Sequence, residues 1–203
     1  MKKNLWLVII LLLLFCISYS QERQQFPLLV SVSNNATQMP FTGYLGVFNV
    51  PMHPGISAGT QISLKDWEKW SIYETLRLGG YYHKYSQLAL ELYSELIFQY
   101  RIRDFAIEPQ VHAGYMMAFT DLQIFELSGE VYEEKAFRGR SQIMTGMGLG
   151  FSYTLNKNSG IPVKLNLAYL VNLQMPFVKH YAPVIIISTL QLGATLFIPW
   201  NSK

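Results

Sequence analysis

The sequence has little charge, a single cysteine and, after its N-terminus, no apolar run long enough for a membrane helix. Charged residues make up 14% of the 203 residues, well below the roughly 25% of soluble chains. The longest apolar run, Leu5–Ile17, is shorter than the roughly 20 residues that a spanning helix needs. Hydrophobic residues nevertheless make up 50% of the chain. This apolar content must therefore be distributed over strands.

The N-terminal segment has the anatomy of a secretory signal. The basic pair Lys2–Lys3 precedes the apolar run, and Ser18–Ser20 provides a small-x-small cleavage site. We expect residues 1–20 to be removed. Lipidation at Cys16 is the alternative, but Phe15 stands where a lipidated cysteine normally needs a small residue before it. Cleavage leaves a mature chain without cysteine and therefore without disulfides.

Alternation of apolar and polar residues is the main structural signal. It is longest in Pro162–Met175, where Leu165 and Leu167 alternate with Lys164 and Asn166. A period of two predicts a strand with one apolar and one polar face, and this one exceeds the roughly 9 to 11 residues that a tilted strand needs to cross a bilayer. The strand candidates are Phe41–Val50, Gly55–Leu64, Trp70–His83, Leu88–Ile102, Phe105–Phe119, Ser141–Leu155, Pro162–Met175 and Val184–Ile198.

These segments predict an all-β protein that forms a closed antiparallel up-and-down transmembrane β-barrel of eight strands. We place the barrel at residues 41–200 as one domain and treat residues 21–40 as a periplasmic lead-in. The placement of the first two strands stays open, because Gly and Pro interrupt their alternation.

The connections between the strands predict the orientation. The short ones, Lys65–Lys69, Arg103–Asp104 and Asn156–Ile161, alternate with longer ones such as Thr120–Arg140. Bacterial barrels have short periplasmic turns and longer extracellular loops, so the short set is periplasmic. An aromatic girdle is expected at the same end. Its residues are Trp67, Trp70 and Trp200.

The polar faces of the strands must point into the lumen, because a basic side chain that faces lipid costs about 2–4 kcal/mol at the bilayer midplane. Eight strands leave room only for side chains or one small ligand. Buried charges persist when they are paired, so we expect a lumen plugged by ion pairs, with ligand binding or proton movement as the alternative. The predicted lumen polar network is Arg77, Glu91, Glu95, Arg101, Glu108 and His112.

The longest outer connection is the candidate recognition surface. Apolar and acidic residues flank Ser128–Gly129, a pattern that predicts a hairpin above the membrane. A partner-binding surface and a solvated rim both fit its mixed charge. The surface-loop residues are Asp121, Glu126, Glu130, Tyr132 and Arg138.

The architecture resembles the small eight-stranded outer-membrane barrels of the OmpA and OmpX type. The end of the last strand is similar to the C-terminal signal that barrel-assembly machinery reads, with Gln191, Gly193, Leu196 and Ile198 at the matching positions, although the chain continues to Lys203. The resemblance implies an integral protein in the outer membrane of a Gram-negative bacterium. The implied partners are outer-membrane lipid and lipopolysaccharide, the assembly machinery and an outer-membrane protein.

Motifs for chemistry are scarce. The mature chain is close to neutral, so nucleic acid is not an expected partner, and we predict no cofactor and no metal. We expect a structural or partner-binding barrel without catalysis; the alternatives are a narrow channel for a small solute and, third, a lipid A-modifying enzyme. Small barrels that deacylate lipid A are similar in architecture. Their His-x-Ser-Asn run is absent here. The most similar pair of residues is His180, in a loop, and Ser188, which we expect to face lipid.

Overall fold

The computed structural model describes residues 25–37, 46–48, 51–84, 86–120, 125–128, 131–134, 139–155, 162–177 and 183–199. The predicted signal peptide at residues 1–20 lies outside them and stays a prediction. Within these ranges no helix is both long and apolar enough to cross a bilayer.

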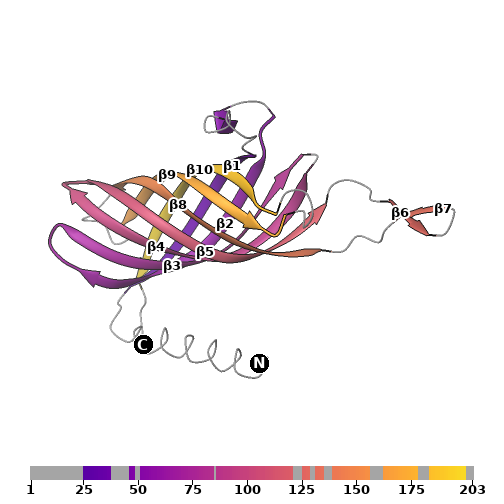
Figure 1. The fold of residues 1–203 in the computed structure, drawn as a ribbon. Coiled ribbons are helices and arrows are strands. Elements are labelled where there is room, and N and C mark those ends of the chain that lie inside the picture. The colour runs from indigo at the N-terminus through magenta and orange to yellow at the C-terminus, as the bar shows by residue number, and fades with distance from the viewer. Residues whose placement is uncertain are drawn as a thin grey trace, which may run out of the picture.

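Eight antiparallel strands close into a barrel (Figure 1). They are β1 Gln25–Thr37, β2 Pro54–Asp66, β3 Trp70–His83, β4 Gln87–Ile102, β5 Phe105–Thr120, β8 Arg140–Leu155, β9 Val163–Met175 and β10 Ile185–Pro199. Neighbours in sequence are neighbours in the barrel, and β1 pairs with β10 to close it. The predicted fold class is confirmed.

The barrel starts earlier than predicted. Its first strand is Gln25–Thr37, inside the segment assigned to a periplasmic lead-in. Of the predicted strand Phe41–Val50, the described residues form a short 3₁₀ helix, η1, at Gly46–Phe48. The alternation of β1 is obscured because Leu29 faces inward between the outward-facing Leu28 and Val30, so the stretch looks like a continuous apolar patch. Pairing with β10 on one side and β2 on the other identifies it as a strand.

The two ends of the barrel differ. Residues 67–69 and 103–104 make short turns at one end, where Gln25 of β1 also pairs with Pro199 of β10. Arg103 adopts a left-handed φ of 58° there, as a tight turn requires. The opposite end carries the connections 38–53 and 121–139. We call these the turn end and the outer end, following the usual arrangement of bacterial barrels.

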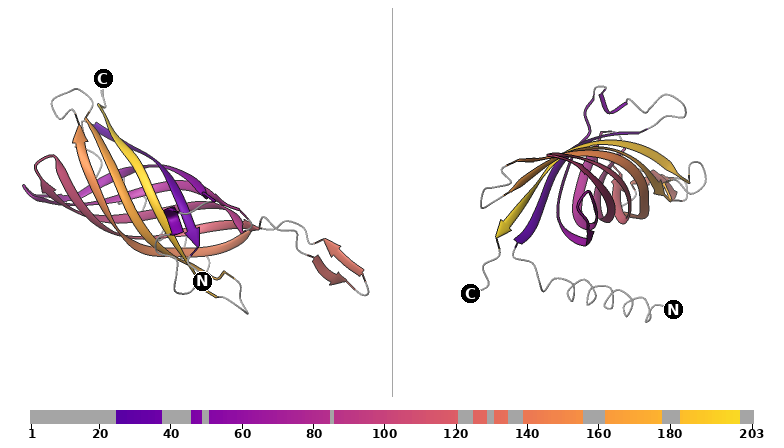
Figure 2. Two further views of the ribbon diagram at one scale, coloured as in Figure 1. Left: turned by 90° about the horizontal axis from the view of Figure 1, so that it is seen from above. Right: turned by 90° about the vertical axis from the view of Figure 1, so that its left-hand side faces the viewer.

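A separate hairpin stands off the outer end. It consists of β6 Phe125–Ser128 and β7 Val131–Glu134, which pair with each other in a two-stranded sheet of their own (Figures 1 and 2). The predicted hairpin around residues 128–129 is therefore present in the backbone.

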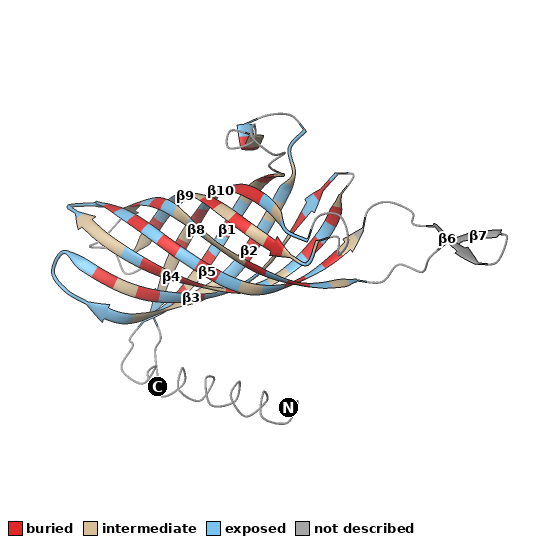
Figure 3. Cartoon of the chain, in the orientation of Figure 1, coloured by how far each residue is buried: buried red, intermediate tan, exposed pale blue. Residues whose placement is uncertain are grey.

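Buried and exposed residues alternate along the barrel strands (Figure 3). The outward residues are mostly large and apolar, among them Leu78 and Leu92, and the buried inward residues are largely polar, such as Thr75, Gln110 and Thr195. This is the reverse of a soluble protein and is what a lipid-facing barrel requires. The facing predicted from the period of two holds on both strands of the central hairpin, β3 and β4.

Candidate functional site

The centre of the lumen holds a buried ion pair. Arg77 Nε of β3 lies 2.7 Å from Glu95 Oε2 of β4, and the two side chains are 3% and 0% exposed. The Thr75 hydroxyl donates to the same carboxylate oxygen at 2.8 Å. Arg77 also donates to the Ser31 hydroxyl of β1 at 3.2 Å, which ties β3 to β1 on the far side of the intervening strand β2. The ion pair and its hydrogen bonds thus connect three strands, β1, β3 and β4.

A second buried carboxylate lies nearer the turn end. Glu108 of β5 accepts hydrogen bonds from Gln99 at 2.6 Å and Ser152 at 2.8 Å, and its Oε1 lies 3.3 Å from Lys164 Nζ of β9. Lys164 also donates to the Tyr73 hydroxyl at 2.9 Å. The Glu108 cluster therefore links strands from opposite sides of the barrel.

The predicted lumen network is divided by the structure into separate groups. Arg77 and Glu95 form one pair, while Arg101 binds Asp66 and the Trp67 carbonyl at the turn end. Glu91 and His112 line a cavity of about 30 Å³ in mid-lumen, large enough for one water molecule. The prediction missed Lys164, although its polar position in the alternation of β9 was visible in the sequence.

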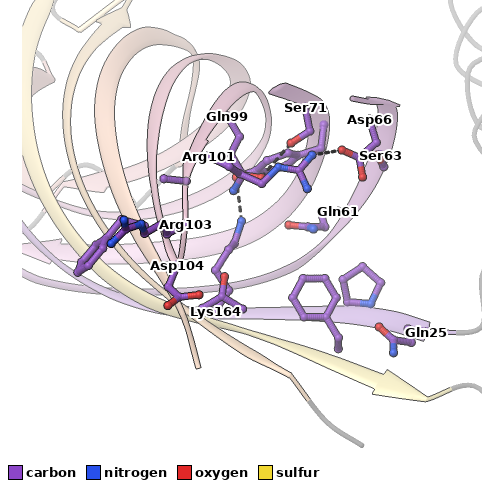
Figure 4. Close-up of a pocket in the computed structure, with 16 residues that line it drawn as sticks. Gln25, Gln61, Ser63, Asp66, Ser71, Gln99, Arg101, Arg103, Asp104 and Lys164 are labelled. Carbon is purple, nitrogen blue, oxygen red and sulfur yellow. Dashed lines mark hydrogen bonds and ion pairs between the residues drawn. The ribbon is translucent and has the colours of Figure 1, made fainter. Parts of the chain in front are cut away.

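The turn end opens into a vestibule of about 650 Å³ inside the barrel (Figure 4). Lys164 lies at its inner end and Arg101 with Asp66 at its mouth; Gln61 and Gln99 lie between them. The charged side chains that line it are three basic and three acidic when Glu108, which binds Lys164, is included. The formal charges that line the vestibule therefore sum to zero.

Two aromatic groups mark the ends. At the turn end Trp67 and Trp70 are 46% and 54% exposed, and with Ile72 and Phe98 they border an outward apolar hollow of about 400 Å³. These are two of the three predicted girdle residues; Trp200 lies outside the described residues. At the outer end two imidazoles stack with ring centroids 3.6 Å apart, those of His53 and His83.

Among the described residues, the outward surface carries one pair of hydroxyls and one hydroxyl–carboxylate pair. Near the outer end, the Tyr115 and Ser141 hydroxyls lie 2.6 Å apart, from β5 and β8. Deeper along the barrel, the Ser94 hydroxyl donates to Glu74 at 2.7 Å. Both pairs are exposed, so both face the lipid. Ser141 is the second residue of its strand, which places it close to the membrane surface.

The expectation that Ser188 faces lipid is wrong. The residue is on the outward side of β10, but it is 0% exposed. Its partner across the strand pair is Ala36 of β1, and its hydroxyl donates to the Ala36 carbonyl at 3.4 Å. The residues of η1 lie over this position: Gly46 packs on Ala36 and Val47 is 3% exposed. Ser188 is thus shielded by the chain itself. His180 lies outside the described residues.

The remaining predicted residues are placed as follows. The assembly-signal residues all lie on β10, with Gln191 and Gly193 turned inward and Leu196 and Ile198 outward. In the outer loop, the backbones of Glu126 and Tyr132 belong to β6 and β7, and Asp121, Glu130 and Arg138 lie outside the described residues. Recognition by the assembly machinery and by a partner protein stays a prediction.

The fold and the apolar outer surface define the class: this is an integral β-barrel of the outer membrane of Gram-negative bacteria. The model of one family, lipid A 3-O-deacylase (PagL), matches residues 53–171, which is more than half of the chain. The chain belongs to this family. The predicted location in the outer membrane is confirmed.

A solved structure has the same fold. The chain is similar to Neisserial surface protein A, with 14% identity over 86% of this chain and 97% of that chain and a TM-score of 0.52. It is also similar to Ail, the attachment invasion locus protein of Yersinia pestis (11% identity, 87% and 99% covered, TM-score 0.44). The outer membrane enzyme PagL is a further match (12%, 85% and 99%, 0.43). No curated protein matches the chain in sequence.

The family overturns the functional prediction. We expected a structural or partner-binding barrel without catalysis, but the family is one of lipid A 3-O-deacylases, which are hydrolases. The absence of the His-x-Ser-Asn run led the prediction away from this family, whereas the family model matches residues 53–171. The non-enzymatic prediction is wrong.

Proposed function

We propose that this protein hydrolyses the ester-linked 3-O-acyl chain of lipid A within the outer membrane. The observation that carries the proposal is the match of the lipid A 3-O-deacylase family to residues 53–171. In this reaction water adds across the ester, releasing a fatty acid and leaving a free hydroxyl on the sugar.

The substrate determines where the reaction takes place. Lipid A lies in the outer leaflet, so its esters meet the barrel on the outward surface near the outer end. The Tyr115–Ser141 pair is on that surface, and Ile143, next to Ser141 on the outward side of β8, is 61% exposed. The Ser94–Glu74 pair also faces outward, but it lies nearer the turn end, away from the depth of the esters.

Ser141 is therefore the candidate nucleophile. A serine attacks an ester when a neighbouring group accepts or directs its proton, and the Tyr115 oxygen lies 2.6 Å from the Ser141 oxygen. The Ser141 hydroxyl thus has a hydrogen-bond partner and is exposed on the outward surface, in contrast to Ser188. Both residues fall inside the region that matches the family.

Mass spectrometry of lipid A from cells that express the chain tests the proposal. Wild type is expected to produce a species that has lost one ester-linked acyl chain. Ser141→Ala should lower its amount by a factor of roughly 100 or more, as losses of catalytic groups do, whereas Ser94→Ala, the deeper outward serine, should leave it unchanged. Unaltered lipid A with a folded wild-type barrel contradicts the deacylase function; full activity of Ser141→Ala contradicts the role of Ser141 alone.

A further inference from the structure

The outward surface is hollowed near the outer end. An apolar groove of about 720 Å³ runs over β2, β3 and the start of β4. Its floor is formed by the outward positions Ala58 and Gly80, and its walls include Ile56, Leu78 and Leu90, which are 64%, 66% and 53% exposed. The volume lies within the roughly 300–1,000 Å³ of ligand pockets.

The floor of the groove is constrained by the backbone. A Cβ atom added to Gly80 would lie 2.7 Å from the Ala89 carbonyl oxygen of the neighbouring strand, a contact that real Cβ atoms do not make. No side chain can therefore fill the hollow from this position without moving β4. The floor of the groove at Gly80 is therefore set by the strand packing, whereas its walls are side chains.

The depth and the rim of the groove fit a phosphorylated lipid of the outer leaflet. Pro54, the first residue of β2, and Tyr82, the penultimate residue of β3, border its outer end. Lys84, the first residue after the end of β3, is exposed. An apolar groove below a cationic side chain matches an acyl chain below a phosphate, because lysine binds phosphate as a point charge.

The groove is continuous with the Ser141 position. Gly80 pairs with Leu90, Leu90 with Met117, and Met117 with Ser141. All four face outward, so they form one row across the surface. Leu90 and Ser141 are two strand spacings apart, roughly 10 Å. A lipid with several acyl chains on one headgroup can therefore occupy the groove with one chain and present the ester of another to Ser141.

We propose that the groove over β2–β4 binds one acyl chain of lipid A and so positions the substrate for deacylation. This inference rests on the proposed function for its substrate and on the groove for its location. The groove contributes shape and apolar contact, and Lys84 contributes the charge that selects a phosphorylated headgroup. The acyl chain bound in the groove is a different one from the acyl chain whose ester is cleaved.

Ala58→Trp tests the groove, because an indole ring at this outward position fills the hollow without touching the lumen. Ala113→Trp is the matched control: it places the same side chain on the outward, exposed surface of β5. The mature barrel, folded in detergent, is mixed with lipid A, and the bound lipid, intact and deacylated forms together, is counted by native mass spectrometry. Heat-modifiable migration in electrophoresis checks that each variant is folded.

Ala58→Trp is expected to retain lipid A roughly tenfold less than wild type, and Ala113→Trp as well as wild type. Equal retention of lipid A by Ala58→Trp and wild type overturns the proposed groove. The proposal is also overturned if Ala58→Trp lowers the retention of phosphatidylethanolamine by the same factor as it lowers the retention of lipid A. The two proposals fail separately: if wild type leaves lipid A unaltered in cells but Ala58→Trp still loses retention in vitro, the groove stands and the hydrolysis does not.

Discussion

The two faces of β3 are built in opposite ways. Inward, Thr75 and Arg77 are almost completely buried, and each is bonded to Glu95. Outward, Leu76 and Leu78 are more than half exposed and make no directed bond. The inward face is held by pairing, so a change there leaves a buried charge without its partner. The outward face is defined by shape, so it can be hollowed to bind a lipid without loss of the barrel.

The largest effect is expected on the inward face. Glu95→Ala leaves the Arg77 guanidinium buried without a counter-charge, and removal of one partner of a buried pair typically costs about 3–5 kcal/mol. The free energy of unfolding, measured by urea titration of the barrel in lipid vesicles, should fall by this amount. The double variant Arg77→Met with Glu95→Leu should recover most of the loss, because no unpaired charge remains.

The control on the outward face is Glu74→Ala. Glu74 is exposed and accepts only the Ser94 hydroxyl in the described set of hydrogen bonds, so its removal should have a much smaller effect than Glu95→Ala. A free energy of unfolding that falls equally in both variants would show that the Arg77–Glu95 pair has no special role in holding the barrel together.

Charge placed on the outward face should have an effect that depends on depth. Leu76 lies midway along β3, whereas Phe105 is the first residue of β5 at the turn end, and the two are 51% and 64% exposed. Leu76→Arg should cost about 2–4 kcal/mol and Phe105→Arg about 0–1 kcal/mol, the difference between the midplane and the interface of a bilayer. The same urea titration measures both, and equal costs would contradict the depth assigned to these residues.

The facing of the strands was predictable because a period of two fixes which side chains share a face. The period of two therefore places Arg77, Glu95 and His112 in the lumen from the sequence alone. The contact between Lys164 and Glu108 was not, because hairpin register relates only adjacent strands, whereas β5 and β9 are separated by β8 in the barrel.

The outward features depended even more on packing in three dimensions. Ser188 has the sequence position of a lipid-facing residue, but η1 folds back over it, and nothing in the alternation of β10 signals this. The groove exists because Ala58 and Gly80, which are distant in sequence, are outward positions on neighbouring strands. Small residues in a strand suggest close approach, but the hollow becomes visible only when both strands are placed.

The smallest effect is expected away from both faces of the barrel, in the outer hairpin. Among the described strands, β6 and β7 pair only with each other, whereas β5 and β8 are joined directly from Phe105–Tyr153 to Ala118–Arg140. Deletion of residues 122–137 should therefore change the free energy of unfolding by no more than about 0.5 kcal/mol, as surface changes usually do.

The same deletion separates stability from recognition. If the hairpin carries the predicted partner surface, a protein that co-purifies with the full-length barrel from native membranes should be lost from the shortened one, while heat-modifiable migration is retained. A shortened barrel that no longer migrates as a folded species would show instead that the hairpin helps β5 and β8 to find their register. The outer hairpin would then contribute to the folding of the barrel, although β6 and β7 do not pair with the barrel strands.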